Sequence, residues 1–218
     1  MAALLSNVDP DGLLEFSVVF TDRSLNHMST DFQGVMCDIF SSLTSVYNTN
    51  FCALVPGGGT YAMESVVRAF ATDQKVMVLR NGWFSFRWSQ IFEAGNIPSE
   101  TIILKARRSS NDSQSAFSPL SINDVVSKIK DEKPSVFFAP HVETSSGIIL
   151  PDEYIKEISN AVHSVGGIFV LDCIASGCIW VDMIACGVDI LISAPQKGWS
   201  ASPCAGIVMM NDVTIARL

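Results

Sequence analysis

A glycine-rich turn and a following helical pattern form the first segment of this 218-residue sequence that could bind a ligand. The turn is Gly57-Gly58-Gly59-Thr60, and the stretch YAMESVVRAF after it favours a helix. Backbone amides at a helix start, together with the helix dipole, bind anions such as phosphate. The turn lacks the Lys-Ser/Thr pair of a P-loop and does not fit GxGxxG. Both an anion site and a tight structural turn agree with this pattern.

An acid and an amine near the end of the sequence could do covalent chemistry. Asp172 ends the apolar run GIFVLD, where an ionised carboxylate is costly unless it is paired. A hydrogen-bonded turn explains such a residue, but a carboxylate facing a pyridine nitrogen would keep that nitrogen protonated and make the ring an electron sink. Lys197 lies in ISAPQKGWSASPCAG without an acidic neighbour. Most lysines are solvated, whereas a desolvated lysine can form a Schiff base.

Two further segments contain side chains that could contact a planar ligand. Phe84 lies in the aromatic-rich segment RNGWFSFRW, and its ring could pack in the core or form a stacking platform. His141 lies in APHVETSSG and could be a polar core residue, a ring-stacking partner or a proton carrier. The residue types alone leave these alternatives open.

The elements that position these residues alternate between strands and helices. The apolar runs are continuous, as in strands covered on both faces, and they predict strands at 51–55, 75–79, 101–105, 135–139, 167–172 and 189–193. Helical patterns lie between them, at about 30–48, 60–72, 84–94, 121–131 and 151–165. This alternation predicts an α/β fold with a mainly parallel sheet and helices on both faces. The candidate residues follow strands, so they are expected at the carboxyl edge of the sheet.

Composition excludes several classes of function. With 48% apolar and 17% charged residues and a net charge of −8, the chain predicts a thick core and no nucleic-acid partner. No apolar run approaches the roughly 18 residues of a membrane span, so a soluble, cytoplasmic protein without a membrane partner is expected. The six cysteines are expected to be buried thiols rather than disulfides. Cys173 and Cys178 lack a second ligand pair, so no metal site is predicted. The Ser-rich segment 107–121 is expected to be a surface loop.

Taken together, five segments resemble the class V pyridoxal-phosphate (PLP) dependent aminotransferases, nearest to the serine–pyruvate and alanine–glyoxylate enzymes. The resemblance runs from about residue 10 to the end and rests on PGGGTYAMES, RNGWFSFRW, PHVETSSGI, LDCIAS and SAPQKGWSASPCAG. It implies the large domain of fold-type I PLP-dependent transferases, pyridoxal 5'-phosphate as cofactor, an amino acid and a 2-oxo acid or glyoxylate as substrates, and a homodimer.

The resemblance also assigns roles to single residues. Lys197 would hold PLP as an aldimine and move a proton between the substrate Cα and the cofactor C4′, and Asp172 would pair with the pyridine nitrogen. Phosphate contacts would come from Gly58, Gly59 and Thr60, with Gln196 on the far side. Phe84 would stack on the ring, Thr144 would bond the phenolic oxygen, and His141 would lie beside the ring. Asn26 and His27 would lie near the substrate entrance.

The chain departs from this family in two ways. Relatives often have Ser-Gly where this chain has Gly58-Gly59, so one hydroxyl contact to phosphate is missing. The sequence also stops at Leu218, before the small C-terminal domain that supplies an arginine for the substrate carboxylate. The expected organisation is an N-terminal arm at 1–30 and an incomplete PLP-binding large domain at 31–218.

Three alternatives remain open at this point. One is another class V chemistry, such as that of a cysteine desulfurase-like lyase, and a second is a non-catalytic remnant that acts as an interaction domain. A nucleotide-binding domain would need an acid about 20 residues beyond the glycine turn. Arg80 and Asn81 occupy that region, so this alternative ranks last.

Overall fold

The computed structural model describes residues 30–218, except for the side chain of Asp31. The chain divides into two units, Met1–Ser42 and Leu43–Leu218. Of the first unit, the structure describes only the part that belongs to helix α1 (Thr30–Tyr47). Asn26, His27 and nearly all of the expected arm at 1–30 lie outside the described residues.

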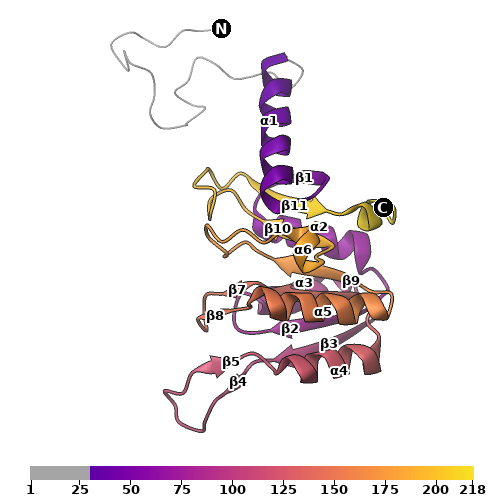
Figure 1. Ribbon diagram of the computed structural model, residues 1–218, viewed down its shortest axis with the longest axis vertical. Coiled ribbons are helices and arrows are strands. Elements are labelled where there is room, and N and C mark those ends of the chain that lie inside the picture. Colours follow the sequence, from indigo (N-terminus) through magenta and orange to yellow (C-terminus); the bar gives the residue numbers. More distant parts are fainter. Residues whose placement is uncertain (1–29) are drawn as a thin grey trace. The chain divides into compact units, whose positions relative to one another are not determined.

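Seven strands of the second unit form one sheet, in the order β1-β11-β10-β9-β6-β2-β3. They are β1 (Phe51–Pro56), β2 (Lys75–Arg80), β3 (Glu100–Lys105), β6 (Val136–Pro140), β9 (Ile168–Asp172), β10 (Ile190–Ser193) and β11 (Ala205–Met210). Every neighbouring pair from β10 to β3 is parallel, whereas β11 is antiparallel to both β10 and β1 (Figure 1). Strand β1 therefore runs in the same direction as β10. The carboxyl ends of all strands in this sheet except β11 share one edge.

Helices cover both faces of this sheet. Helices α2 (Gly59–Phe70) and α3 (Phe86–Gly95) lie behind the sheet in Figure 1, while α4 (Ile122–Glu132), α5 (Asp152–Ser164) and the short α6 (Met183–Cys186) lie in front of it. Helix α7 (Asp212–Ile215) follows β11. Two small hairpins complete the unit: β4 (Arg107–Arg108) with β5 (Phe117–Ser118), and β7 (Val142–Glu143) with β8 (Ile148–Ile149).

The core lies on both sides of the central strands. All five residues of β6 are buried, because a central parallel strand is covered on each face. Phe138 faces α3, where its ring centroid lies 4.6 Å from that of Trp88. Phe137 points to the opposite face, where its ring meets Phe169 edge-on at 6.0 Å. Strand β6 and its neighbour β9 therefore form a rigid base for the loops at their carboxyl ends.

The predicted strands and helices are confirmed, with small differences at their ends. Ser121 caps α4 by accepting a hydrogen bond from the Asp124 amide at 3.2 Å. The segment 107–121 is largely exposed but contains the β4–β5 hairpin, which the sequence did not predict. No helix in the described part of the chain is long and apolar enough to cross a membrane.

The expectation that the cysteines are buried is wrong for half of them. All six are free thiols, but only Cys173 and Cys186 are buried, and Cys52 is partly exposed. The exposed ones are Cys37, Cys178 and Cys204. Cys178 and Cys204 lie close to apolar runs, yet they belong to the loops after β9 and before β11 rather than to the strands.

At the amino edge of the sheet, a buried carboxylate joins several elements. Asp189 is 4% exposed and accepts hydrogen bonds from the Phe169 amide, the Asn211 side chain and His163 Nε2 at 2.7, 2.7 and 2.8 Å. The hydrogen bond to Asp189 raises the pKa of His163, against the smaller opposing effect of burial. Protonated His163 is therefore favoured in the folded state.

This arrangement predicts a pH-dependent contribution to stability. His163 stabilises the fold fully below its ordinary pKa of 6.5, and the contribution is lost as the pH rises through the higher folded value. We expect His163→Gln to lower Tm more at about pH 5.5 than at about pH 9, where both side chains are neutral. Thermal unfolding across this range tests the expectation, and an equal loss of Tm at both pH values would contradict it.

Candidate functional site

The glycine turn after β1 places the start of α2 at the carboxyl edge of the sheet. Gly58 is the residue before the helix, with extended backbone angles, and a Cβ added to it would meet no atom within 4 Å. A Cβ on Gly59 would lie 2.5 Å from Ile174 Cδ1, so the helix start packs closely on the loop after β9. The first amides of a helix lack carbonyl partners within it. The turn therefore presents free N–H groups beside open space, as an anion site requires.

Strand β11 packs closely against the glycine turn and the first turn of α2. A Cβ on Gly206 would lie 2.7 Å from the Gly58 carbonyl oxygen and 2.5 Å from Ala62 Cβ. The Gly57 amide also donates to the Cys204 carbonyl at 3.0 Å. Only glycine at 206 permits this approach of β11 to α2. These contacts join the glycine turn to the segment that follows Lys197.

Asp172 lies at the end of β9 as a buried carboxylate, and no positively charged group among the described residues pairs with it. It is 8% exposed, and its Oδ1 accepts the Ile174 amide at 2.9 Å, which is the structural turn that the sequence left open. Burial raises its pKa to about 6, and the charge of Glu143 adds to this effect. Within residues 30–218 it forms no ion pair. Such a carboxylate would gain stability from a cationic partner that arrives with a ligand.

Lys197 lies in the loop that joins β10 to β11, at the same edge as Asp172. Ile192 of β10 pairs with Asp172 in register, and the Cys173 amide donates to the Ile192 carbonyl at 2.8 Å. The side chain of Lys197 is exposed, as is that of Gln196. The carboxyl end of β9, where Asp172 lies, is therefore next to the carboxyl end of β10, which leads into the loop of Lys197.

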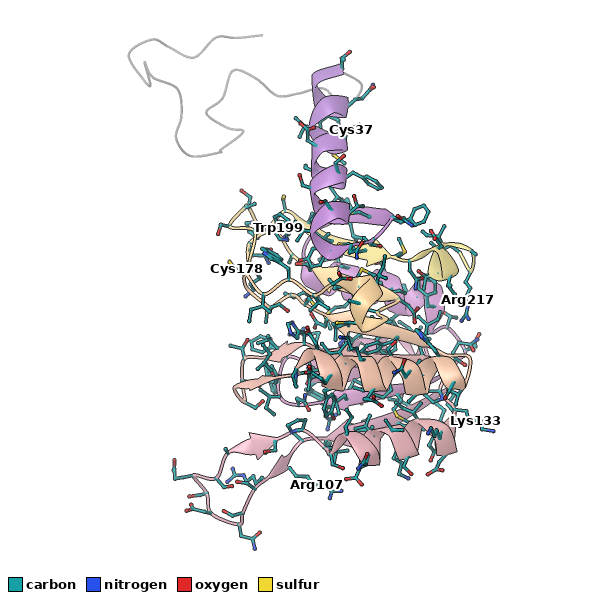
Figure 2. The ribbon with its side chains drawn as sticks, in the orientation of Figure 1. Cys37, Arg107, Lys133, Cys178, Trp199 and Arg217 are labelled. Carbon is teal, nitrogen blue, oxygen red and sulfur yellow. The ribbon has the colours of Figure 1, made fainter. Side chains whose placement is uncertain are left out.

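Aromatic contacts hold the loop just beyond Lys197. Trp199 donates through Nε1 to the Tyr47 hydroxyl at 3.3 Å, and Tyr47 in turn donates to Ser193 at 3.2 Å. The rings of Trp199 and Trp180 lie 4.8 Å apart. Trp199 and Cys178 are labelled at this edge in Figure 2. These contacts fix the lysine loop against both the strand before it and the loop after β9.

His141 connects the loop after β6 to the loop after β9. It is 2% exposed; its Nδ1 lies 2.7 Å from Ser176 Oγ, and its amide donates to the Asp172 carbonyl at 2.8 Å. Burial lowers its pKa, so the neutral imidazole is favoured. The buried ring is thus held by Ser176 in the uncharged form, while the His141 backbone is bonded to the Asp172 carbonyl.

Phe84 and Thr144 lie on the same rim, and both are exposed. The Phe84 ring is 50% exposed, so it is not a core residue, and Thr144 follows the buried Glu143. Of the expected site residues, the exposed ones are Thr60, Phe84, Thr144, Gln196 and Lys197, while Gly59, His141 and Asp172 are buried and Gly58 is half-buried. These residues lie on loops that follow strands of the same sheet. The loop of Phe84 contacts the loop of Glu143. The loop of His141 contacts Asp172, and the loop after Asp172 contacts the start of α2.

Glu143 and Ser85 are site residues that the sequence reasoning missed. Glu143 is fully buried and accepts hydrogen bonds from the amides of Phe84 and Ser85 at 3.0 and 2.8 Å. Its only sequence signal is an acidic residue followed by small hydroxyl residues after an apolar strand. This signal is weak, since loops commonly have such a composition.

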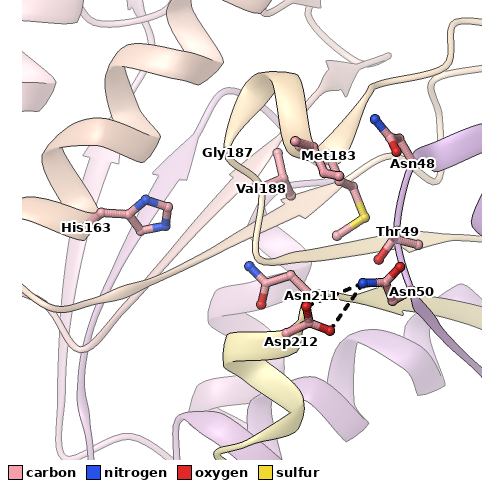
Figure 3. Close-up of a pocket in the computed structure, with 10 residues that line it drawn as sticks. Asn48, Thr49, Asn50, His163, Met183, Gly187, Val188, Asn211 and Asp212 are labelled. Carbon is pink, nitrogen blue, oxygen red and sulfur yellow. Dashed lines mark hydrogen bonds between the residues drawn. The ribbon is translucent and has the colours of Figure 1, made fainter.

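A pocket at the amino edge is a separate feature (Figure 3). It has a volume of about 240 Å³, and its lining includes Asn48, Asn50, Asn211 and Asp212. These groups bond one another or nearby carboxylates, as Asn50 does with Asp212 at 3.3 Å. The pocket contains none of the expected site residues. No group of three or more metal-ligating side chains occurs among residues 30–218.

Comparisons with known proteins find aminotransferases among the proteins that are similar to this chain. No protein-family model matches the chain. It is 28% identical over 166 residues to a 2-aminoethylphosphonate–pyruvate transaminase of Bacteroides fragilis, which covers 75% of this chain and 42% of that protein. It is 25% identical over 194 residues to the alanine–glyoxylate aminotransferase of Rattus norvegicus, covering 87% of this chain and 44% of the other.

Solved structures share the fold. The ureidoglycine–glyoxylate aminotransferase of Bacillus subtilis superposes with a TM-score of 0.76 at 20% identity, over 89% of this chain and 48% of that one. This likeness identifies the fold. The chain spans about half the length of the curated relatives that it matches.

Proposed function

We propose that this chain binds pyridoxal 5'-phosphate and carries the cofactor half of a transamination site of the class V type. Its similarity to aminotransferases in sequence and in fold supports this proposal. The reaction would move an amino group between an amino acid and a 2-oxo acid or glyoxylate. The names of the relatives support alanine or 2-aminoethylphosphonate as the donor and pyruvate or glyoxylate as the acceptor.

One observation carries this proposal. Asp172 is a buried carboxylate without a cationic partner in the described part of the chain, and its strand end adjoins the loop of Lys197. A protonated pyridine nitrogen is a cation of the right size to pair with it. When bound, PLP supplies an electron sink for a carbanion at the substrate Cα.

The remaining residues have matching tasks. The free amides at Gly58, Gly59 and Thr60 would bind the phosphate, and the exposed Gln196 would approach it from the lysine loop. His141, neutral and buried, would keep water from this edge, where its amide is bonded to the Asp172 carbonyl. Lys197 would bind the cofactor aldehyde carbon covalently and, once released by the amino acid, would take the Cα proton as a general base.

The rim residues would orient the ring. Phe84 would stack on one face, and the Thr144 hydroxyl would donate a hydrogen bond to the phenolic oxygen. Asn26 and His27, outside the described residues, would contribute near the substrate entrance. A homodimer belongs to the same proposal, because the resemblance to this family implies a dimer. A cytoplasmic location is proposed together with it.

The proposal is tested by mixing the purified chain with PLP. We expect a visible absorption band that borohydride removes, with the label found by mass spectrometry on the peptide that contains Lys197. Incubation with alanine or 2-aminoethylphosphonate should then convert the cofactor to its amine form, and glyoxylate or pyruvate should reverse the change. A colourless chain that takes up no label would refute the proposal and favour a non-catalytic interaction domain.

A hydroxyl restored at the glycine turn should strengthen cofactor binding. The site has open space at Gly58, and its extended backbone suits any residue. We therefore expect Gly58→Ser to leave Tm unchanged and to lower the Kd for PLP about tenfold, the effect of one hydrogen bond to a charged group. Gly58→Ala is the matched control, because it adds the Cβ without the hydroxyl. Equal affinities of these two variants would show that no phosphate lies there.

A further inference from the structure

Three side chains bind every backbone amide of the turn between β2 and α3. The turn comprises Asn81–Ser85, and the side chains are those of Ser85, Glu143 and Ser145. The bonds are Asn81 N and Gly82 N to Ser85 Oγ at 2.9 and 3.1 Å, Trp83 N to Ser145 Oγ at 2.8 Å, and Phe84 N and Ser85 N to Glu143 Oε1 and Oε2 at 3.0 and 2.8 Å. We call this arrangement the amide clamp. Two of these five amides are bound within the turn by Ser85, and the other three are bound by a loop about 60 positions away.

Glu143 is the centre of the amide clamp. Besides the two amides, it accepts hydrogen bonds from the hydroxyls of Ser85 and Ser145, both at 2.6 Å. It is 0% exposed and forms no ion pair with any described residue. Burial alone would raise its pKa, but the four hydrogen bonds outweigh burial and hold the pKa below its ordinary value. Glu143 is thus a buried anion held by hydrogen bonds alone.

The two loops of the clamp touch without space between them. A Cβ at Gly82 would lie 2.3 Å from Ser145 Oγ and 2.7 Å from Glu143 Cγ. The turn therefore cannot move toward Glu143. It cannot move away without breaking hydrogen bonds to a buried charge, each of which contributes more than a neutral hydrogen bond.

The side chain of Phe84 lacks a comparable support. It is 50% exposed, and no aromatic ring among residues 30–218 packs on it, whereas its neighbour Trp83 contacts Phe86 at 5.9 Å. Without an aromatic neighbour, the Phe84 ring depends on its backbone for the direction in which the side chain leaves the turn. That backbone is fixed on both sides of the Phe84 Cα by amides that donate to Glu143.

We propose that Glu143 is the positioning residue for Phe84, and that the amide clamp holds this ring ready to stack on a planar cofactor. The inference rests on the proposed function, because stacking needs a cofactor. It assigns the buried carboxylate a role in the affinity of the site without any contact between Glu143 and the ligand.

The first test uses Glu143→Gln in the full 218-residue chain. Glutamine has nearly the same shape as glutamate. However, its NH₂ group would face an N–H or O–H donor at a position where the carboxylate oxygen accepted a hydrogen bond. In the cofactor-free protein, we expect the amides of Trp83, Phe84 and Ser85 to exchange hydrogen faster, while those of β6 stay protected. Titration with PLP, followed by absorbance, should give a Kd about tenfold higher than that of the wild type.

A double-mutant cycle separates positioning from a general loss of structure. If Glu143 acts through the ring, Glu143→Gln should weaken PLP binding about tenfold in the wild type and by less than about twofold in a Phe84→Ala background. Asp189→Asn is the control for loss of a buried carboxylate, because Asp189 accepts backbone and side-chain hydrogen bonds at the opposite edge. It should lower Tm without changing the Kd for PLP.

The outcomes are distinct. An unchanged Kd in Glu143→Gln, or equal effects of this change with and without Phe84, would overturn this inference and leave the proposed function intact. A wild-type chain that binds no PLP would overturn both. If Glu143→Gln does not fold, Ser145→Ala removes one donor to Glu143 and the acceptor of the Trp83 amide, and it should show the same coupling to Phe84. Absence of that coupling would overturn the inference in the folded variant.

Discussion

Replacement of Lys197 by alanine is expected to abolish the proposed covalent bond between the chain and PLP. The loop between β10 and β11 places this amine next to the strand end of Asp172. Lys105 also lies at a carboxyl strand end, but it ends β3, the outermost strand on the other side of the sheet. The visible band should be absent, and borohydride should fix no label. Any amino-transfer rate should fall by about 10²–10⁴-fold, the usual contribution of a general base.

The design of this experiment needs a control lysine and a rescue. Lys128 on α4 is exposed, and Lys128→Ala should leave the band unchanged. A small amine added to Lys197→Ala should restore part of the proton transfer but not the label. Label found on another lysine in the wild type, or a normal band in Lys197→Ala, would refute the assignment.

Asp172→Asn should have opposite effects on stability and on function. In the folded chain, burial raises the pKa of Asp172 from 3.8 to about 6, so its ionisation opposes folding. The sign follows: stability declines as the pH rises from about 4 to about 6, where the folded state binds more protons than the unfolded state. Asparagine avoids this cost and keeps an oxygen that can accept the Ile174 amide.

At about pH 8, the cofactor-free Asp172→Asn chain should therefore be more stable than the wild type, by on the order of 3 kcal/mol. At about pH 4 the two should be equal, since the wild-type carboxyl is then protonated. The same variant should bind PLP about ten- to a hundredfold more weakly, because it loses a charged hydrogen bond to the ring.

Chemical denaturation at both pH values and a PLP titration measure the two effects on one protein. Thr214→Val, which alters a buried polar group at the amino edge, controls for a general change in stability. If Asp172→Asn is less stable than the wild type at about pH 8, the interpretation that the Asp172 carboxylate is destabilised by the lack of a cationic partner is wrong.

The sheet and its edge could be predicted because their signal lies in continuous apolar runs. FCALV, SVFFA and GIFVLD must be covered on both faces, and the order of strands and helices then brings their carboxyl ends together. Asp172 and Lys197 stood out because a carboxylate after an apolar strand and a lysine without an acid are unusual. Their common edge follows from the topology and is confirmed by the pairing of β9 with β10.

Other features could not be predicted, for identifiable physical reasons. The reversed direction of β11 has no signature, since GIVMM is as apolar as the parallel strands. Glu143 was missed because its hydrogen bonds link two loops distant in sequence, and such pairing follows no period. The exposure of Cys178 and Cys204 was missed because apolar residues lie near both of them in the sequence, although each belongs to a loop outside the strands.

The reversed strand β11 determines how the lysine loop can vary. Because β11 returns antiparallel to β10, the loop 194–204 leaves and re-enters the sheet at the same edge, between two adjacent strand ends. Residues could be added to or removed from it without any change in strand order. The position of the amine therefore depends on the length and contacts of this loop and not on the order of the strands.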